Sequence, residues 1–331
     1  MPVKKGYNIS GQSYRRKDAT VNNILQLKYA VEVERTGSIS KAAESLYMNQ
    51  PNLSKAIRDL ENDLGITIFA RTAKGVVPTE QGREFLSYAK NILAQIAEME
   101  TLYKPAADSK LRFDICVPRA SYISYAFTEF IKALGPDADI GINYRETNSM
   151  RAIKNVADSV NNLAVVRYQA LYESYFLNAL SERRLQYEPV WEFSYLALMS
   201  RAHPLAGLQV LEFPMLQKYT EIVHGDLSVP ALPVAQARQL ARANEKKKTI
   251  AVYERGSQFE LLSRIPSTYM WVSPMPHDVL DCFRLVQKCC TASQNTYKDI
   301  LITRAGYRHT PEDKLFIRKL RESVVMVSGD L

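Results

Sequence analysis

Residues 41–65 read KAAESLYMNQPNLSKAIRDLENDLG, and this stretch decides the fold of the amino-terminal part of the chain. A short helix is predicted over KAAESLY, where the paired alanines Ala42 and Ala43 permit a close helix crossing. The helical repeat breaks at Tyr47. A second helix then starts after Asn49, a good N-cap residue, with Pro51 in its first turn. Two short helices joined by a tight turn are typical of a helix-turn-helix motif.

The second of these helices has two different faces. Its apolar stripe consists of Leu53, Ile57, Leu60 and Leu64, and Gly65 ends it. The remaining positions carry amide, hydroxyl and basic groups, which hydrogen-bond base edges and phosphates in the major groove. An ordinary solvated face, normally richer in Glu and Lys, is the alternative. The residues predicted to contact DNA in the two helices are Ser40, Lys41, Asn49, Gln50, Pro51, Asn52, Ser54, Lys55 and Arg58.

The flanking segments complete a small domain over residues 21–80. A first helix is predicted from Ile24 to Gly37, and Ser38 or Ser40 caps the next helix. After Gly65, two short β-like runs surround residues 73–75 and form a hairpin that carries Arg71 and Lys74. We interpret this hairpin as a wing and add both basic residues to the predicted DNA contacts.

A long helix is predicted over residues 79–104, with Thr79 as its cap. Its apolar residues are spaced alternately by four and three positions, which is typical of a helix that packs against a partner helix. Homodimerisation is the functional interpretation, and packing onto its own domain is the alternative. The residues of this seam are Phe85, Ala89, Ile92, Ile96, Met99 and Tyr103.

Residues 24–103 closely resemble the winged helix-turn-helix of LysR-type transcriptional regulators. The elements GSISKAAESL, NQPNLSKAIRDLENDLG, IFART and VPTEQG match that family in order and spacing. The resemblance implies that the helix after Asn49 enters the major groove, that the wing contacts the DNA backbone or minor groove, and that the long helix forms a dimer. Two departures are Ala30, where the family usually has a larger aromatic residue, and the additional segment 1–20.

Composition indicates a globular protein with an anionic partner. The 331 residues are 46% hydrophobic and 24% charged, with a net charge of +8. Residues 1–20 hold five Lys or Arg and one Asp, which is half of that excess. We expect a basic disordered arm there, which either contacts phosphates or is a solvated tail.

Targeting segments and metal motifs give no signal. No apolar run reaches the length of a membrane span, and the amino-terminus has no signal-peptide core, so we expect a cytoplasmic protein. The four cysteines form no CxxC motif and have no His at ligand spacing, so we expect reduced thiols, no metal and no cofactor.

Residues 111–331 alternate between strand and helix patterns, which predicts parallel sheets covered by helices and an α/β fold overall. The segment resembles the effector domain of LysR-type regulators, which is similar to periplasmic binding proteins. We place lobe 1 at about 111–168 and 280–331, and lobe 2 at about 185–275. Asn161 and Asn162 stand where the family often has an acidic residue, so no ligand preference is transferred.

Ligands of open α/β folds bind beyond the carboxyl ends of the strands. Two arginines and several hydroxyl groups follow the predicted strands, which suits a small anion such as a carboxylate. A helix cap, a surface pair or a satisfied core residue is the alternative at each position. The residues predicted to bind an effector are Arg119, Ser121, Thr147, Asn148, Ser149, Arg167, His224 and Ser273.

These patterns predict a sequence-specific DNA-binding transcriptional regulator that responds to a small effector. Its partners would be double-stranded DNA, the effector, a second copy of the chain and RNA polymerase, with dimer or tetramer left open. One alternative is a ligand-independent regulator that uses the lobes for oligomerisation. The other is an α/β enzyme with an accessory DNA-binding domain, although no nucleophile elbow, P-loop, GxGxxG or metal cluster occurs.

Overall fold

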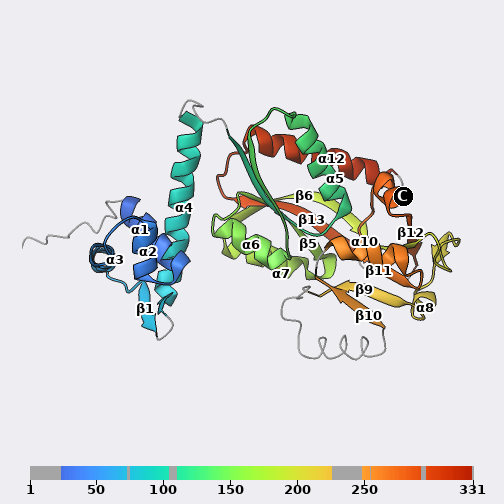
Figure 1. Cartoon of the computed structure of the whole chain (residues 1–331), viewed down its shortest axis with the longest axis horizontal. Helices are drawn as coiled ribbons and strands as arrows, with labels where there is room; N and C mark the ends of the chain where they lie inside the picture. Colours follow the sequence, from blue (N-terminus) through green and yellow to red (C-terminus); the bar gives the residue numbers. More distant parts are fainter. Residues whose placement is uncertain are drawn as a thin grey trace, which may run out of the picture. The chain divides into compact units, whose positions relative to one another are not determined.

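The computed structural model of the chain describes residues 24–72, 75–103, 110–225, 248–253, 255–291 and 296–329 (Figure 1). The side chains of residues 98 and 101–103 are outside this description. Contacts divide the chain into two compact units, Met1–Pro105 and Ala106–Leu331. The predicted arm at 1–20 and Lys74 lie outside the described residues.

The first unit has the elements predicted for a winged helix-turn-helix. Helices α1 (Ile24–Thr36), α2 (Ile39–Ser45) and α3 (Gln50–Leu64) precede the hairpin of β1 (Phe69–Thr72) and β2 (Gly75–Pro78), and α4 (Glu80–Tyr103) follows. Gly37 and Gly65 both have positive φ, as expected of glycines that end helices. The core of the unit is apolar and includes Ala30, which is fully buried.

Lobe 1 of the second unit is a five-stranded sheet in the order β4-β3-β5-β13-β6. Its strands are β3 (Leu111–Val117), β4 (Ile140–Glu146), β5 (Leu163–Gln169), β6 (Leu185–Ser194) and β13 (Thr296–Arg304). Its helices are α5 (Ser121–Leu134), α6 (Ser149–Ala157), η1 (Ala170–Tyr172), α7 (Glu173–Glu182) and α12 (Pro311–Ser328).

Successive side chains along the strands of lobe 1 point to opposite faces of the sheet, so each strand contributes to two separate apolar layers. Val165 and Leu301 pack with α5 and α12, whereas Val166 and Ile302 pack with α6 and α7. Figure 1 shows these two helix pairs on opposite sides of the sheet. The sheet is therefore buried on both faces, as the continuous apolar run 163–166 indicates.

Lobe 2 is a six-stranded sheet in the order β10-β9-β11-β7-β12-β8. Its strands are β7 (Leu196–Ser200), β8 (Val210–Leu211), β9 (Thr220–His224), β10 (Thr249–Val252), β11 (Thr268–Val272) and β12 (Leu285–Cys290). Its helices are α8 (Phe213–Leu216), α10 (Arg255–Arg264) and α11 (His277–Cys282).

The structure corrects two predictions about the lobes. Strand β6 belongs to lobe 1 and β12 to lobe 2, so the predicted boundaries at 185, 275 and 280 are wrong. The sheets are also mixed rather than parallel, since β13 runs antiparallel to β5 and β6, and β7 antiparallel to β11 and β12. One cause is that β7 begins two positions after the end of β6, so the chain passes from lobe 1 to lobe 2 there without a helix that would reverse its direction.

Candidate functional site

The turn between α2 and α3 is fixed by backbone hydrogen bonds. The Met48 N–H donates to the Ala43 carbonyl at 2.9 Å, and the Tyr47 N–H donates to the Glu44 carbonyl at 3.1 Å. Ser38 caps α2 by accepting from the Lys41 N–H at 3.4 Å. Asn49 is the N-cap residue of α3, as predicted, but its side chain makes no capping bond. Its amide is therefore exposed at the start of α3.

Eight of the nine predicted DNA contacts in α2, α3 and the turn are exposed. The Arg58 Nε donates to the Ser54 carbonyl at 3.3 Å, which orients the guanidinium along the helix. Ser54 is the exception: it is 8% exposed, so its assignment to the DNA-reading face is wrong. Ser54 lies three positions before Ile57 and therefore on the packing side of the helix. The exposed residues are Ser40, Lys41, Asn49, Gln50, Pro51, Asn52, Lys55 and Arg58.

The wing is attached at both of its strands: Glu61 accepts hydrogen bonds where β1 begins, and the Val76 N–H of β2 donates to the Gly37 carbonyl at 2.9 Å. The Glu61 Oε1 accepts from the Ile68 N–H at 2.7 Å and from the Phe69 N–H at 3.0 Å, where the hairpin begins. At the other strand, a Cβ on Gly75 would lie 2.5 Å from the Gly37 carbonyl oxygen, so only glycine fits there. Arg71 is exposed on β1. The sequence showed no sign of the Glu61 contact.

The predicted seam on α4 divides into two parts. Ala89 is 1% exposed and Phe85 packs on the core of the first unit, in which α4 lies against α1. Packing within the domain, the alternative interpretation, therefore holds for these two residues. Further along, Ile92 is 43% and Met99 is 53% exposed, and Ile96 is half-buried. Tyr103 is in the helix, but its side chain lies outside the description.

A cavity of about 580 Å³ lies between the two lobes of the second unit. All eight residues that the sequence predicted for effector binding line it, because each lies near the carboxyl end of a strand that meets this cleft. Ser121, Thr147 and Ser273 are buried. Aromatic residues form much of the remaining wall: Tyr168, Tyr172, Phe176, Tyr195, Phe213, Phe259, Trp271 and Tyr297.

Arg167 is already paired with a carboxylate that the sequence did not reveal. Its Nε and Nη2 donate to Asp299 at 2.8 and 2.6 Å, and the hydroxyl of Tyr122 donates to the same carboxylate. Burial, together with the neighbouring Asp299, raises the pKa of Tyr122 well above its usual value, so the phenol stays protonated. The Arg167 guanidinium also lies 4.8 Å from the Phe193 ring centroid. Its charge is therefore largely compensated.

Arg255, which the sequence interpretation missed, joins the two lobes. It starts α10 in lobe 2 and pairs with Glu146 of lobe 1, and its Nη2 donates to the Ser121 Oγ at 2.8 Å. A second bond across the cleft runs from the Arg119 Nη2 to the Tyr253 carbonyl at 3.0 Å. Two of the three arginines that line the cavity thus have carboxylate partners, which reduces the positive charge that the sequence implied.

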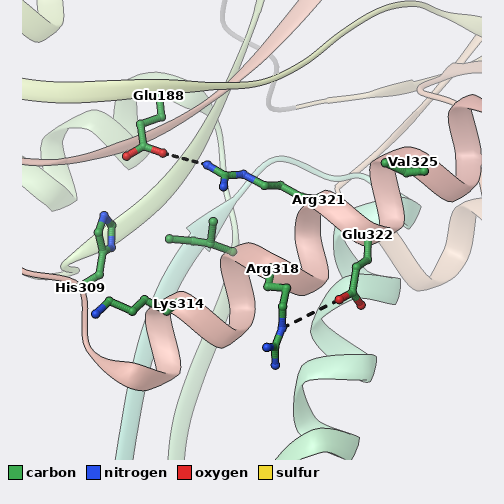
Figure 2. Close-up of a pocket in the computed structure, with 8 residues that line it drawn as sticks. Glu188, His309, Lys314, Arg318, Arg321, Glu322 and Val325 are labelled. Atoms are coloured by element: carbon green, nitrogen blue, oxygen red, sulfur yellow. Dashed lines mark hydrogen bonds and ion pairs between the residues drawn. The ribbon is translucent and has the colours of Figure 1, made fainter.

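A second hollow, of about 720 Å³, lies along α12 (Figure 2). Figure 2 shows two ion pairs among its lining residues: Arg321 pairs with Glu188 at 3.1 Å, and Arg318 with Glu322 at 3.9 Å. It shares no lining residue with the cleft between the lobes. The cleft is therefore the candidate ligand site.

The remaining predictions about the chain's chemistry concern thiols and membranes. In the part of the chain that the structure describes, Cys116 and Cys290 are buried, and Cys282 and Cys289 are exposed. None of the described helices combines the length and apolarity that a bilayer crossing needs.

A helix-turn-helix unit with an exposed polar face, followed by a two-lobed α/β unit, is the architecture of a class of DNA-binding proteins. Residues 24–83 match the family model described as bacterial regulatory helix-turn-helix protein, lysR family. The chain thus carries a LysR-family helix-turn-helix domain and, in its described residues, the fold of LysR-type regulators. This confirms the resemblance and the fold class predicted from the sequence.

Curated relatives and solved structures agree with this assignment. The RuBisCO operon transcriptional regulator of Allochromatium vinosum is 26% identical over 61% of this chain and 63% of its own length. The HTH-type transcriptional regulator TfdT of Cupriavidus pinatubonensis is 32% identical over 37% of this chain and 54% of its own length. The chain therefore spans less than two thirds of these relatives.

Solved structures are similar in fold across most of the chain. ArgP from Mycobacterium tuberculosis superposes with a TM-score of 0.60 at 16% identity, covering 90% of this chain and 96% of ArgP. CbnR in complex with its target DNA gives a TM-score of 0.52 at 14% identity, covering 91% of this chain and 99% of CbnR.

Proposed function

We propose that the protein is a sequence-specific DNA-binding transcriptional regulator that acts in the cytoplasm and works with RNA polymerase. The exposed polar face of α3 in a LysR-family helix-turn-helix domain is the observation that carries this proposal. Gln50 is in the first turn of α3 and Arg58 is eight residues later, which places them about 80° apart around the helix axis, and both are exposed. Amide and guanidinium groups on one exposed helix face suit base edges in a major groove.

The test is a genome-wide pull-down of bound DNA fragments followed by affinity measurements on the recovered site. Gln50→Ala and Arg58→Ala should each weaken binding about 5- to 100-fold, the range of one base or phosphate contact. Asn62→Ala is the matched control, because Asn62 is an exposed amide at the opposite end of α3. Unchanged affinity in both variants, or recovery of sequence-independent DNA alone, would contradict the proposal.

The cavity between the lobes supports regulation by a small effector. Its volume of about 580 Å³ falls in the range of small-molecule sites, and it combines aromatic walls with buried hydroxyl groups and Arg119. These features fit a small, largely apolar molecule with a carboxylate or another hydrogen-bonding group. Such a molecule would act by binding one arrangement of the lobes more tightly than the other. The inter-lobe bonds of Arg255 and Arg119 are the contacts that such a change would alter.

Intrinsic fluorescence offers a direct test of the effector proposal. Trp271 lines the cavity, and Trp191 is the only other tryptophan in the chain. A Trp191→Phe variant therefore reports the cavity alone, and we expect small aromatic acids to change its emission. If no compound changes either this emission or the affinity for DNA, the ligand-independent alternative is favoured.

The exposed part of the α4 seam supports self-association. Two large apolar side chains one heptad apart, Ile92 and Met99, lie on the exposed surface of the first unit. Ile92→Glu combined with Ile96→Glu should dissociate the oligomer measured by light scattering. If this variant is still a dimer, the interface does not lie on the α4 seam.

A further inference from the structure

Tyr47 lies in the turn of the helix-turn-helix and has a backbone conformation that is unfavourable for tyrosine. Its φ is +53°, in the left-handed region, and it follows α2 at the position where helix ends favour glycine. The two hydrogen bonds of the turn, from the Tyr47 and Met48 N–H groups, are those of a Schellman motif, which requires this conformation. A side chain with a Cβ costs free energy there, and glycine would not.

The ring of Tyr47 does not repay this cost through packing. It is 98% exposed, the largest value among the large hydrophobic side chains of the described residues. The neighbouring Met48 and Leu46 are half-buried against the core of the unit, so the turn is anchored by them and not by Tyr47. A strained residue with no packing role points to a contact outside the chain.

The position of Tyr47 identifies the chemistry of that contact. It lies three residues before Gln50, hence within about 10 Å of the first residue of α3. In helix-turn-helix complexes the amino-terminal end of the second helix enters the major groove, and the first helix crosses the sugar-phosphate backbone. The turn between them is therefore at the rim of the groove, and tyrosine hydroxyls are among the groups that donate to phosphate oxygens there.

We propose that the Tyr47 hydroxyl donates a hydrogen bond to a backbone phosphate at the edge of the major groove. This inference rests on the proposed DNA-binding function. A phosphate contact fixes the position of the protein on the duplex and carries no sequence information itself. Because the phenol is neutral, it also releases no counterion, so it adds affinity without adding to the salt dependence of binding.

Because Tyr47 has a left-handed conformation, Tyr47→Gly removes the phosphate contact and also relieves the backbone strain. A loss of DNA affinity in this variant is therefore not caused by a loss of stability. We expect Tyr47→Phe and Tyr47→Gly in the full chain to weaken binding about ten-fold per subunit. The loss should be equal on a labelled duplex carrying the recovered site and on a random duplex of the same length, with an unchanged salt slope. The unfolding midpoint of Tyr47→Gly should equal or exceed that of the parent.

Arg284→Gly is the matched control, because Arg284 is exposed with φ +53° in the second unit. It should share the stability effect and retain parental DNA affinity. Parental affinity in both Tyr47 variants, with Gln50→Ala still impaired, would overturn the inference and leave the proposed function standing. A loss in Tyr47→Gly alone, or on the specific duplex alone, would also overturn it, because the ring or a base would then be the contact.

Discussion

Asp299→Asn is expected to lower the free energy of unfolding of the two-lobed unit by about 3–5 kcal/mol. The Asp299 side chain is 0% exposed, and that of its partner Arg167 is 8% exposed. The substitution keeps the shape but removes the negative charge, so a buried guanidinium loses its counter-charge. The amide also presents a donor toward groups that are themselves donors, Arg167 and the Tyr122 hydroxyl.

Urea unfolding followed by the fluorescence of Trp191 measures this effect. Trp191 packs edge-on against Tyr122, with ring centroids 5.1 Å apart, and therefore reports the same region. With a slope of about 2–3 kcal/mol per M, the midpoint should fall by roughly 1–2.5 M. A Trp271→Phe background removes the second emitter.

Two further variants separate the buried pair from ion pairs in general. Glu188→Gln removes a surface pair with Arg321, in which both side chains are more than half exposed, and should cost less than about 1 kcal/mol. The combined variant Arg167→Met, Asp299→Leu and Tyr122→Phe should recover most of the stability, because it leaves neither an unpaired charge nor a buried hydroxyl without its acceptor. A loss below about 1 kcal/mol in Asp299→Asn would refute the reasoning, since the guanidinium would then be compensated elsewhere.

Three other predictions concern single contacts. Burial lowers the pKa of His203 below its usual 6.5. Below about pH 6.5 this residue is therefore protonated more readily in the unfolded chain than in the folded chain, so the free energy of unfolding should fall as the pH drops below about 6.5. His203→Asn, which keeps an acceptor for the Leu205 N–H, should flatten this dependence in urea titrations at several pH values. Gly82→Ala would place a Cβ 2.0 Å from the Ile68 carbonyl oxygen and should destabilise the first unit by at least about 1–3 kcal/mol in thermal melts. Glu61→Ala should cost about 1–3 kcal/mol and make the wing more sensitive to protease, whereas Glu61→Gln should retain most of the stability.

The sequence predicted the elements whose signals are local. The first helix, predicted from Ile24 to Gly37, is observed as α1 over Ile24–Thr36, and the turn of the helix-turn-helix lies where Asn49 and Pro51 placed it. The eight residues predicted for effector binding line one cavity, because each lies near the carboxyl end of a strand and the rule for α/β sheets depends only on that position.

The contacts that escaped the sequence join residues far apart along the chain. Arg255 and Glu146 are separated by 109 positions, and Arg167 and Asp299 by 132. No periodicity reports such a pairing, so the arginines of the cleft looked more available for an anion than they are. The sequence did not predict that β6 belongs to lobe 1 and β12 to lobe 2 for the same reason. The lobe of a strand depends on which strands it pairs with and not on the sequence pattern within the strand.

The place of β13 in the sheet has a consequence for how the protein is made. This strand lies between β5 and β6, yet β3 begins at residue 111 and β13 at residue 296. A ribosome adds about 5–20 residues per second, so synthesis takes roughly 10–40 s to proceed from the start of β3 to the start of β13, and lobe 1 cannot be completed before then. The amino-terminal unit is built from neighbouring segments and has emerged by that time. A nascent chain therefore presents α3 before lobe 1 is complete. A premature stop codon between residues 111 and 296 would release a protein with α3 complete and lobe 1 unfinished.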